Sequence, residues 1–378
     1  MFDPQLVAAF AQQETPFYYY DLDLLQQTLE AASAAASAHN FHVHYALKAN
    51  FNQRVLEAIR DMGFGADCVS GNEVKRAVDI GFAPSKIVFA GVGKSDKEIN
   101  LALEHDIFAF NVESISELEI IDRLAAATGS AARVALRINP NVDAHTHHYI
   151  TTGLDENKFG IAQWELGEAV ETLRRCPNIT LVGIHFHIGS QITDLNVFKS
   201  LCVKVNELNY WFGDRGFRLP VLNVGGGLGV DYYHPDEHPI PDFQGYFNVF
   251  SECLERFPGQ EVHFELGRAL VSQCSALISR VLYVKHGIKK NFLILDAGMT
   301  ELMRPALYQA YHRIERLGHH NGLESGERLH YDVVGPICES TDCFGKEVEL
   351  PKALRGDLIA IRTTGAYGEV MASHYNLR

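Results

Sequence analysis

The chain has 378 residues, of which 47% are hydrophobic and 21% charged, so it is long enough for about two globular domains. This composition excludes a disordered tail, a collagen-like rod and a coiled coil. The formal net charge is -14, from 33 Lys and Arg against 47 Asp and Glu, and the sequence holds no basic run. We therefore expect neither a nucleic-acid partner nor a membrane partner, and small-molecule chemistry remains.

The N-terminus and the cysteines indicate a reducing compartment. Apolar runs such as residues 87–90 are far shorter than the ~18 residues that span a bilayer. Residues 1–16 lack the basic and apolar stretches of a secretion signal. The 7 cysteines form no Cys-x-x-Cys pair, which argues against a disulfide framework or a zinc knuckle. We expect a cytoplasmic protein.

Eight short apolar, β-branched segments recur along the first two thirds of the chain. They lie at residues 42–48, 63–70, 86–92, 107–113, 132–138, 181–188, 220–226 and 261–267. Amphipathic helix candidates separate most of them, for example at residues 52–62, 71–80, 94–105 and 114–127. Eight strand–helix repeats predict an α/β fold of the (β/α)8 barrel type, whose usual size is about 250 residues. An open doubly wound sheet is the alternative, but its first strand would run into Gly-x-Gly-x-x-Gly.

The pattern changes after residue 270. Strand-like segments joined by turns follow at residues 276–286, 291–298, 329–335 and 357–368, and residues 15–21 are also strand-like. The sequence predicts a cofactor-binding barrel over residues 22–270. Residues 1–21 and 271–378 are expected to form a mainly β domain, with the N-terminal strand paired into its sheet.

Residues that carry chemistry follow several of the predicted barrel strands. In such a barrel the active site lies at the carboxyl ends of the strands. The residues there are Lys48, Asp67, His187, Ser190, the glycine-rich run 225–229, Glu265 and Arg268. A strand-end lysine suits a Schiff base, and bare N–H groups in a glycine-rich turn suit a phosphate. Taken singly, a surface lysine and a tight turn are the alternatives, but together they indicate pyridoxal 5'-phosphate.

Eight motifs stand in the order found in one enzyme family. They are YALKAN (45–50), GADCVSGNE (65–73), HFHIGSQ (185–191), NVGGGLG (223–229), ELGR (265–268), DAGMTELMRPALY (296–308), VVGPICES (333–340) and GAYG (365–368). The series resembles the diaminopimelate decarboxylases, within the fold type III pyridoxal-phosphate-dependent decarboxylases. The resemblance implies a (β/α)8 barrel followed by a β domain. The family's EPGR is ELGR here, which leaves Glu265, Gly267 and Arg268 in place.

The resemblance implies roles around the cofactor. Lys48 resembles the residue that holds it as a Schiff base, His187 the residue that stacks on its ring, and Glu265 the carboxylate paired with the pyridinium nitrogen. Asp67 is implied as a supporting residue. The family's racemases place an arginine where Glu265 stands, so an acid there favours decarboxylation. Further cofactor contacts are implied at Ser190, Gly226, Gly227, Gly267, Arg268 and Tyr367.

Substrate contacts are implied in the segments after the barrel. Arg304 and Tyr308 are four residues apart, which places them on the same side of a helical turn. With Arg268 they resemble the family's clamp for a distal carboxylate, and Glu339 resembles the residue that meets the distal ammonium. The implied substrate is meso-2,6-diaminopimelate, decarboxylated at its D-centre to L-lysine and CO2 in the last step of lysine biosynthesis.

Two residues imply a homodimer with shared active sites. Cys338 resembles the cysteine that reaches the site from the neighbouring subunit and protonates the carbanion. Tyr367 resembles a tyrosine that also crosses over, toward phosphate and substrate. The β domain is thus expected to complete the substrate site and the dimer interface.

Three other functions compete with this interpretation. One is a sister decarboxylase acting on ornithine, arginine or carboxynorspermidine, and another is a non-catalytic binder of pyridoxal phosphate. The third is a metal-dependent hydrolase, because His42 and His44 have the spacing of a barrel metal motif and the stretch 143–148 adds further imidazoles. His42 and His44 precede Lys48, toward the wrong end of the strand, so we expect no catalytic metal.

Overall fold

The computed structural model describes residues 2–142, 158–318 and 327–378. The chain divides into two compact units. One, the barrel unit, consists of Gln26–Gly229 and Asp242–Leu270. The other, the β unit, consists of Met1–Leu25, Val230–Pro241 and Val271–Arg378. Among the described residues, no helix combines the length and the apolar character that crossing a bilayer requires.

Parallel strands in chain order close the barrel, with the first strand paired to the last. They are β2 (Phe41–Ala46), β3 (Gly65–Cys68), β4 (Ile87–Phe89), β5 (Ala109–Val112), β6 (Ala132–Arg137), β7 (Ile179–His185), β8 (Val221–Asn223) and β9 (Glu261–Leu266). Each of the predicted segments contains most of one of these strands, so the barrel prediction is confirmed. Strand β4 is buried on both faces, which explains its unbroken apolar pattern.

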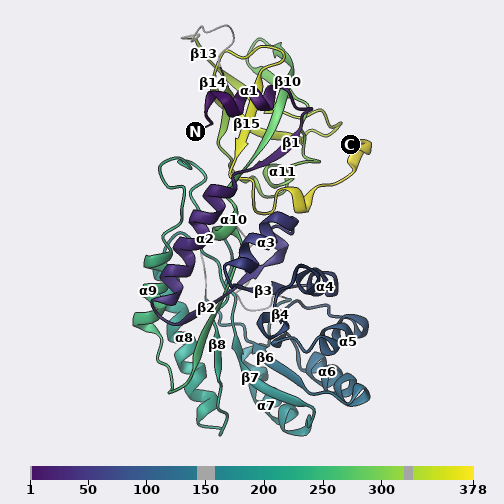
Figure 1. The fold of residues 1–378 in the computed structure, drawn as a ribbon, viewed down its shortest axis with the longest axis vertical. Coiled ribbons are helices and arrows are strands. Elements are labelled where there is room, and N and C mark those ends of the chain that lie inside the picture. The colour runs from purple at the N-terminus through teal and green to yellow at the C-terminus, as the bar shows by residue number, and fades with distance from the viewer. Residues whose placement is uncertain (1, 143–157, 319–326) are drawn as a thin grey trace. The chain divides into compact units, whose positions relative to one another are not determined.

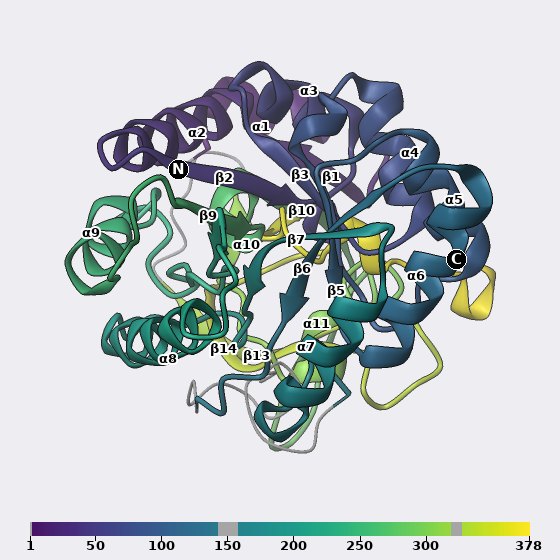
Figure 2. The same ribbon diagram turned by 90° about the horizontal axis from the view of Figure 1, so that it is seen from below.

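Helices cover the outside of the strand ring (Figure 2). They are α2 (Leu22–Ser37), α3 (Gln53–Asp61), α4 (Gly71–Ile80), α5 (Asp96–Glu104), α6 (Ile115–Thr128), α7 (Leu166–Arg175), α8 (Asn196–Gly213) and α9 (Phe243–Cys253). The starts of α4, α5 and α6 follow from their sequence, because Ser70, Ser95 and Ser114 each accept a hydrogen bond from the backbone three residues later. Helices α4 and α6 end at Gly81 and Gly129 in the left-handed conformation.

The β unit is built on a seven-stranded sheet in the order β12-β15-β10-β11-β13-β14, with β1 paired to β10. Its strands are β1 (Phe17–Tyr20), β10 (Ser275–His286), β11 (Asn291–Leu295), β12 (Ile314–Leu317), β13 (Arg328–Val334), β14 (Cys343–Pro351) and β15 (Leu358–Arg362). Its short helices are α1 (Pro4–Ala11) and α11 (Arg304–Tyr308), and α10 (Arg268–Val271) spans the boundary with the barrel unit. The predicted pairing of the N-terminal strand is confirmed, and β1 lies in the same sheet as β10 (Figure 1).

Two strands and one segment differ from the sequence interpretation. Strands β12 and β14 were not predicted, because they are the charged edge strands of the sheet and lack an apolar pattern. Residues 230–241, which the predicted barrel range includes, group with the β unit. Asp236 forms an ion pair with Arg362 at 3.0 Å, and the Arg304 guanidinium lies 4.9 Å from the Tyr232 ring centroid. These contacts hold the segment to the β unit.

Candidate active site

A cavity of about 400 Å³ lies at the carboxyl ends of the barrel strands, a volume that suits a small ligand. Its lining residues come from the loops and strand ends at that side of the barrel: Lys48, Asp67, Val69, Ala90, Gly91, Val92, Gly93, Arg137, Phe159, His185, His187 and Glu265. Four residues that the sequence analysis selected, Lys48, Asp67, His187 and Glu265, therefore meet at one cavity. A larger hollow of about 1200 Å³ in the β unit holds none of the selected residues.

Lys48 lies on a single 3₁₀ turn (Leu47–Ala49) directly after β2. The Tyr45 hydroxyl on β2 is buried and donates to the Asn50 carbonyl at 2.9 Å, which fixes the path of this turn. The Lys48 Nζ lies 3.9 Å from Asp67 Oδ2, and its side chain is 39% exposed. The amine thus stands at the cavity wall within reach of both a carboxylate and a ligand.

Glu265 is a buried carboxylate held by three donors. Its Oε1 accepts from the side-chain amides of Asn111 and Asn223, each at 2.8 Å, and its Oε2 accepts from His185 Nε2 at 2.8 Å. Burial by itself raises the pKa of Glu265, but His185 and Lys48 outweigh it and hold this pKa well below its usual range. Glu265 is therefore ionised at neutral pH.

The pKa of Asp67 shifts in the opposite direction from that of Glu265. Burial and the neighbouring Glu265 raise the pKa of Asp67 well above its usual range, against the opposing effect of Lys48. The pKa values of these two carboxyl groups therefore differ widely, so that Glu265 keeps its charge while Asp67 can hold a proton. Burial, together with Lys48 and Arg137, lowers the pKa of His187 well below its usual value, so this imidazole is neutral.

The glycine-rich turn after β8 packs directly on neighbouring backbone. Gly225 has a φ of 68°, and a Cβ there would overlap the Phe186 carbonyl oxygen. A Cβ on Gly226 would overlap the Glu265 carbonyl oxygen. Side chains are therefore excluded from the turn, so an anionic group can approach the backbone at its centre. At its two ends, the Gly225 N–H donates to Asn223 Oδ1 at 3.0 Å and the Gly229 N–H donates to the Ile192 carbonyl at 2.9 Å.

Ser190 and Arg268 lie together beside this turn. The Arg268 Nε and Nη2 donate to Ser190 Oγ at 3.2 and 3.1 Å. Gly227 approaches the neighbouring Gly189, since a Cβ on Gly227 would come within 2.8 Å of the Gly189 carbonyl. Gly267 stands between the strand ends, where a Cβ would come 3.2 Å from the Ala46 Cβ. A guanidinium, a hydroxyl and a side-chain-free turn thus form one anion-binding corner.

These residues fit pyridoxal phosphate. Two buried atoms that line the cavity, Asp67 Oδ1 and His185 Nδ1, have no hydrogen-bond partner within the described part of the chain. Buried polar atoms normally have partners, so their position at a cavity wall indicates a polar ligand. An amine, an ionised carboxylate and an anion-binding corner around the same barrel end match the groups that this cofactor needs.

Sequence reasoning missed four residues of the site. Asn111, Asn223 and His185 hold the Glu265 carboxylate, and Arg137 pairs with Glu113 at 2.6 Å while its guanidinium lies 4.8 Å from the Phe159 ring centroid. All four stand at or near the carboxyl ends of β5, β6, β7 and β8. The predicted segments run past these positions, to residues 113, 138, 188 and 226, so the strand-end criterion passed over them.

The β unit holds the predicted substrate residues. Arg304 and Tyr308 lie on α11, so the predicted helical turn is confirmed. Arg304 is buried, and its Nη1 donates to His312 Nε2 at 2.8 Å while the guanidinium lies over Tyr232. The guanidinium is thereby held in one orientation.

Cys338, Glu339 and Tyr367 lie on two turns of the same unit. Cys338 and Glu339 are exposed, and Tyr367 is half-buried with a φ of 57°. The Asp342 carboxylate accepts from the backbone of Met299 and of Ile337, each at 2.7 Å, which joins the segment before Arg304 to the Cys338 turn.

Tyr18 on β1 joins a third segment to these. Its hydroxyl donates to the Glu301 carbonyl at 2.6 Å and lies 3.0 Å from where a Gly368 Cβ would stand. The segments that carry Arg304, Cys338 and Tyr367 therefore converge within the β unit.

Of the histidines considered as ligands of a hydrolytic metal, those that the structure describes do not line this cavity. His44 lies on β2 below the cavity, where its ring bonds to the Lys86 carbonyl and to His263. Asp143, His145, His147 and His148 lie outside the described residues.

Known proteins resemble this chain over almost its whole length. Residues 23–272 match the family model described as pyridoxal-dependent decarboxylase, pyridoxal binding domain. A diaminopimelate decarboxylase from Bacteroides thetaiotaomicron is 55% identical, over 98% of this chain and 95% of that protein. The crystal structure of diaminopimelate decarboxylase from Helicobacter pylori complexed with L-lysine is 40% identical, with a TM-score of 0.91 over 98% of this chain and 91% of that one. The enzyme from M. jannaschii in co-complex with L-lysine gives 34% identity and a TM-score of 0.89, over 98% and 87% of the two chains.

Proposed function

The chain belongs to the diaminopimelate decarboxylases of the pyridoxal-dependent decarboxylase family, and on this premise we propose that it converts meso-2,6-diaminopimelate to L-lysine and CO2, as the last step of lysine biosynthesis. The observation that carries the proposal is the ionised Glu265 carboxylate, held by Asn111, Asn223 and His185 in the same cavity as the Lys48 amine. This pairing of an acid with a strand-end lysine favours decarboxylation over racemisation.

The barrel residues would hold pyridoxal 5'-phosphate. The Lys48 amine binds its aldehyde carbon, and Ser190, Arg268 and the turn containing Gly226 and Gly227 bind its phosphate. His187, neutral and buried, offers an uncharged ring face for stacking. When bound, the cofactor accepts the electron pair that remains on the substrate carbon as CO2 leaves.

Glu265 supports that chemistry by keeping a proton on the ring nitrogen. Three donors stabilise its charge, so the carboxylate does not take the proton for itself. Asp67, whose pKa is raised by burial, serves as a neighbouring group that can hold a proton beside the Lys48 amine. The two carboxyl groups thereby take different roles.

Substrate selection lies with the β unit. The Arg304 guanidinium, oriented by His312 and Tyr232, binds the distal carboxylate together with Tyr308 and Arg268, because a planar fork matches a carboxylate. Glu339 binds the distal ammonium. A substrate that lacks the distal carboxylate, such as ornithine, would instead bring its distal ammonium toward the Arg304 guanidinium, and the two positive charges would repel each other.

The proposal is tested by measuring CO2 and L-lysine from meso-2,6-diaminopimelate with the cofactor-loaded protein. We expect equal amounts of the two products, and at least about a hundredfold lower kcat/KM for L-ornithine, L-arginine and carboxynorspermidine, because these substrates bring no distal carboxylate to Arg304 and add a positive charge beside it. The L,L-isomer of diaminopimelate, which has no D-centre, is the matched substrate control. Faster CO2 release from a diamine substrate, or none from diaminopimelate, would contradict the proposal.

The protein acts as a homodimer in which Cys338 of one subunit protonates the substrate carbon in the cavity of the other, and Tyr367 crosses in the same direction. The exposure of Cys338 and Glu339 on a turn pinned by Asp342 supports a role toward a second subunit.

Mixing two inactive variants tests this arrangement. Cys338→Ala is expected to lower kcat by about 10²–10⁴ while the cofactor stays bound, as for the loss of a general acid. After subunit exchange with Lys48→Ala, half of the dimers hold one intact site, so roughly a quarter of the wild-type activity returns. Mixtures no more active than their components would show that each cavity uses its own Cys338.

A further inference from the structure

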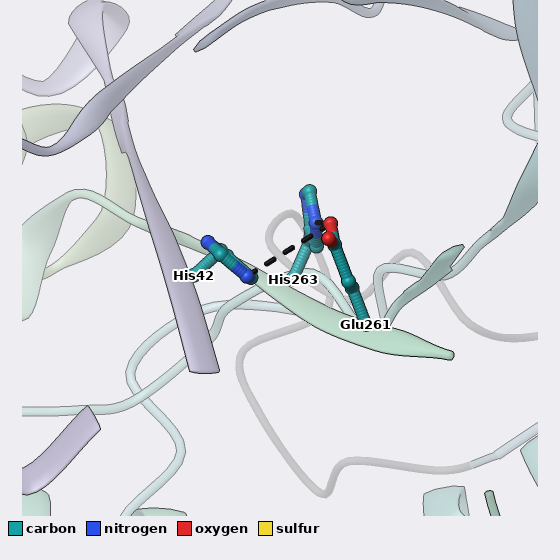
Figure 3. Close-up of side chains that lie close together, drawn as sticks. All are labelled: His42, Glu261 and His263. Atoms are coloured by element: carbon teal, nitrogen blue, oxygen red, sulfur yellow. Dashed lines mark hydrogen bonds and ion pairs between the residues drawn. The ribbon is translucent and has the colours of Figure 1, made fainter. Parts of the chain in front are cut away.

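Three potential metal ligands converge at the amino-terminal ends of β2 and β9, at the end of the barrel opposite to the cavity (Figure 3). His42 is the second residue of β2, and Glu261 and His263 stand two apart on β9. His42 and His263 are directly paired in the register of these neighbouring strands, and Glu261 lies on the same face. The strands β2 and β9 are the first and last of the barrel, so the three side chains lie across its closing seam.

The distances suit a single small cation. His263 Nε2 lies 3.0 Å and His42 Nε2 lies 3.8 Å from Glu261 Oε2, and all three ligand atoms lie within 4.8 Å of one another. Ligands at about 2.0–2.2 Å from a tetrahedral ion are about 3.4 Å apart. The side chains of His42 and Glu261 are 52% and 53% exposed, so small rotations bring them to this spacing, while His263 is buried and fixed.

His263 belongs to a chain of ring contacts. His44 Nδ1 lies 3.0 Å from the Lys86 carbonyl oxygen, so it must donate. On its other side, His44 Nε2 lies 2.9 Å from His263 Nδ1. One nitrogen of His263 thus meets a second imidazole, and the other faces Glu261.

The Nε2 of His263 lies 3.0 Å from the Glu261 carboxylate. The ring of His263 is held in place, since Phe108 stacks on it with centroids 5.3 Å apart and planes 18° from parallel. An imidazole whose second nitrogen bonds to an outer partner has the usual arrangement of a metal ligand.

We propose that His42, Glu261 and His263 bind a divalent transition-metal ion of the zinc class, with water completing the coordination, and that the ion fastens β2 to β9. Two imidazoles and one carboxylate suit zinc, cobalt or nickel better than calcium or magnesium. The site takes no part in the decarboxylation, because it lies at the other end of the strands from Lys48 and Glu265.

The experiment uses the cofactor-loaded protein, stripped of metal by a chelator and then titrated with Zn²⁺ by calorimetry. We expect one site per chain, weakened at least about tenfold by His42→Ala and by Glu261→Gln, since loss of an outer-shell partner alone costs about 10–100-fold. Both positions are half-exposed, so neither change leaves a buried cavity. Zn²⁺ should raise the unfolding temperature of the wild type and not of these variants.

His238→Ala is the matched control. His238 Nδ1 lies 2.9 Å from Asp231 Oδ2, an exposed imidazole–carboxylate pair to which the described residues add no third ligand within reach. This variant should bind Zn²⁺ as the wild type does. CO2 release should be the same in His42→Ala and the wild type, whether or not Zn²⁺ is present. Equal Zn²⁺ affinity in the wild type and the His42 and Glu261 variants, or no stoichiometric binding at all, would overturn the proposal.

Discussion

Replacing Lys48 with alanine will abolish CO2 release and remove the yellow colour of the cofactor-loaded protein. Of the described residues that line the cavity, Lys48 is the one primary amine, so nothing else there can bind the cofactor's aldehyde carbon. We expect the rate to fall on the order of 10³-fold or more, because a residue that forms the covalent link cannot be replaced by positioning alone. The measurements are the visible spectrum of the purified protein and CO2 release from diaminopimelate.

Lys86→Ala is the control for this change. Lys86 belongs to the same barrel, but it precedes β4 at the opposite end, and its Nζ donates to the Gly63 carbonyl at 2.8 Å. The Lys86→Ala variant should keep both the yellow colour of the bound cofactor and the wild-type rate of CO2 release. A Lys48→Ala protein that stays yellow and active would place the reactive amine elsewhere and end the assignment of this cavity.

Glu265→Gln should lower kcat by about 10²–10³ without releasing the cofactor, which is the loss expected when one preorganised electrostatic group is removed. A neutral amide cannot keep a proton on the ring nitrogen, and its NH2 group would oppose the donors of Asn111, Asn223 and His185. The proposed phosphate contacts at Ser190 and Arg268 are untouched by this change, so cofactor binding should persist. The decisive comparison is kcat against the cofactor content of each preparation.

The pH dependence follows from the direction of the pKa shift. The pKa of Glu265 lies below its usual range, so its charge is present at neutral pH and persists on acidification through the range where ordinary glutamates protonate. The wild-type rate should therefore show no loss from this group as the pH falls from 7 to about 5. Glu261→Gln, on the same strand and the opposite end, should leave kcat unchanged. Retention of full kcat by Glu265→Gln would refute the role of the acid.

Much of the barrel could be predicted because its parallel strands are mostly buried and carry short runs of apolar and β-branched residues at regular spacing. The residues at the strand ends could be selected because one rule of the fold places them at the same rim. Asn111 and Asn223 escaped notice because neutral amides within strands carry no signal by themselves, and only their contact with Glu265 gives them meaning.

Contacts between strands that are far apart in the sequence could not be predicted from the sequence alone. His42 was weighed with His44, two residues on, whereas in the barrel its partner is His263, more than two hundred residues away, because closure pairs β2 with β9. Strands β12 and β14 were missed for a different reason. They lie at the edges of the sheet. Strand β14 carries exposed charged residues, and β12 is only four residues long with Glu315 and Arg316 at its centre, so neither shows an apolar pattern.

Gly226 packs directly on the Glu265 carbonyl, and this close packing fixes the length of ligand that the barrel rim can bind. The corner proposed to bind the phosphate and the strand that carries Glu265 are in direct backbone contact, with no flexible side chain between them. Their spacing therefore cannot adapt, and a coenzyme analogue with a longer or shorter arm would engage only one of the two ends. Any residue larger than glycine at position 226 would change that spacing. It would therefore displace Glu265 as well as the turn proposed to bind the phosphate.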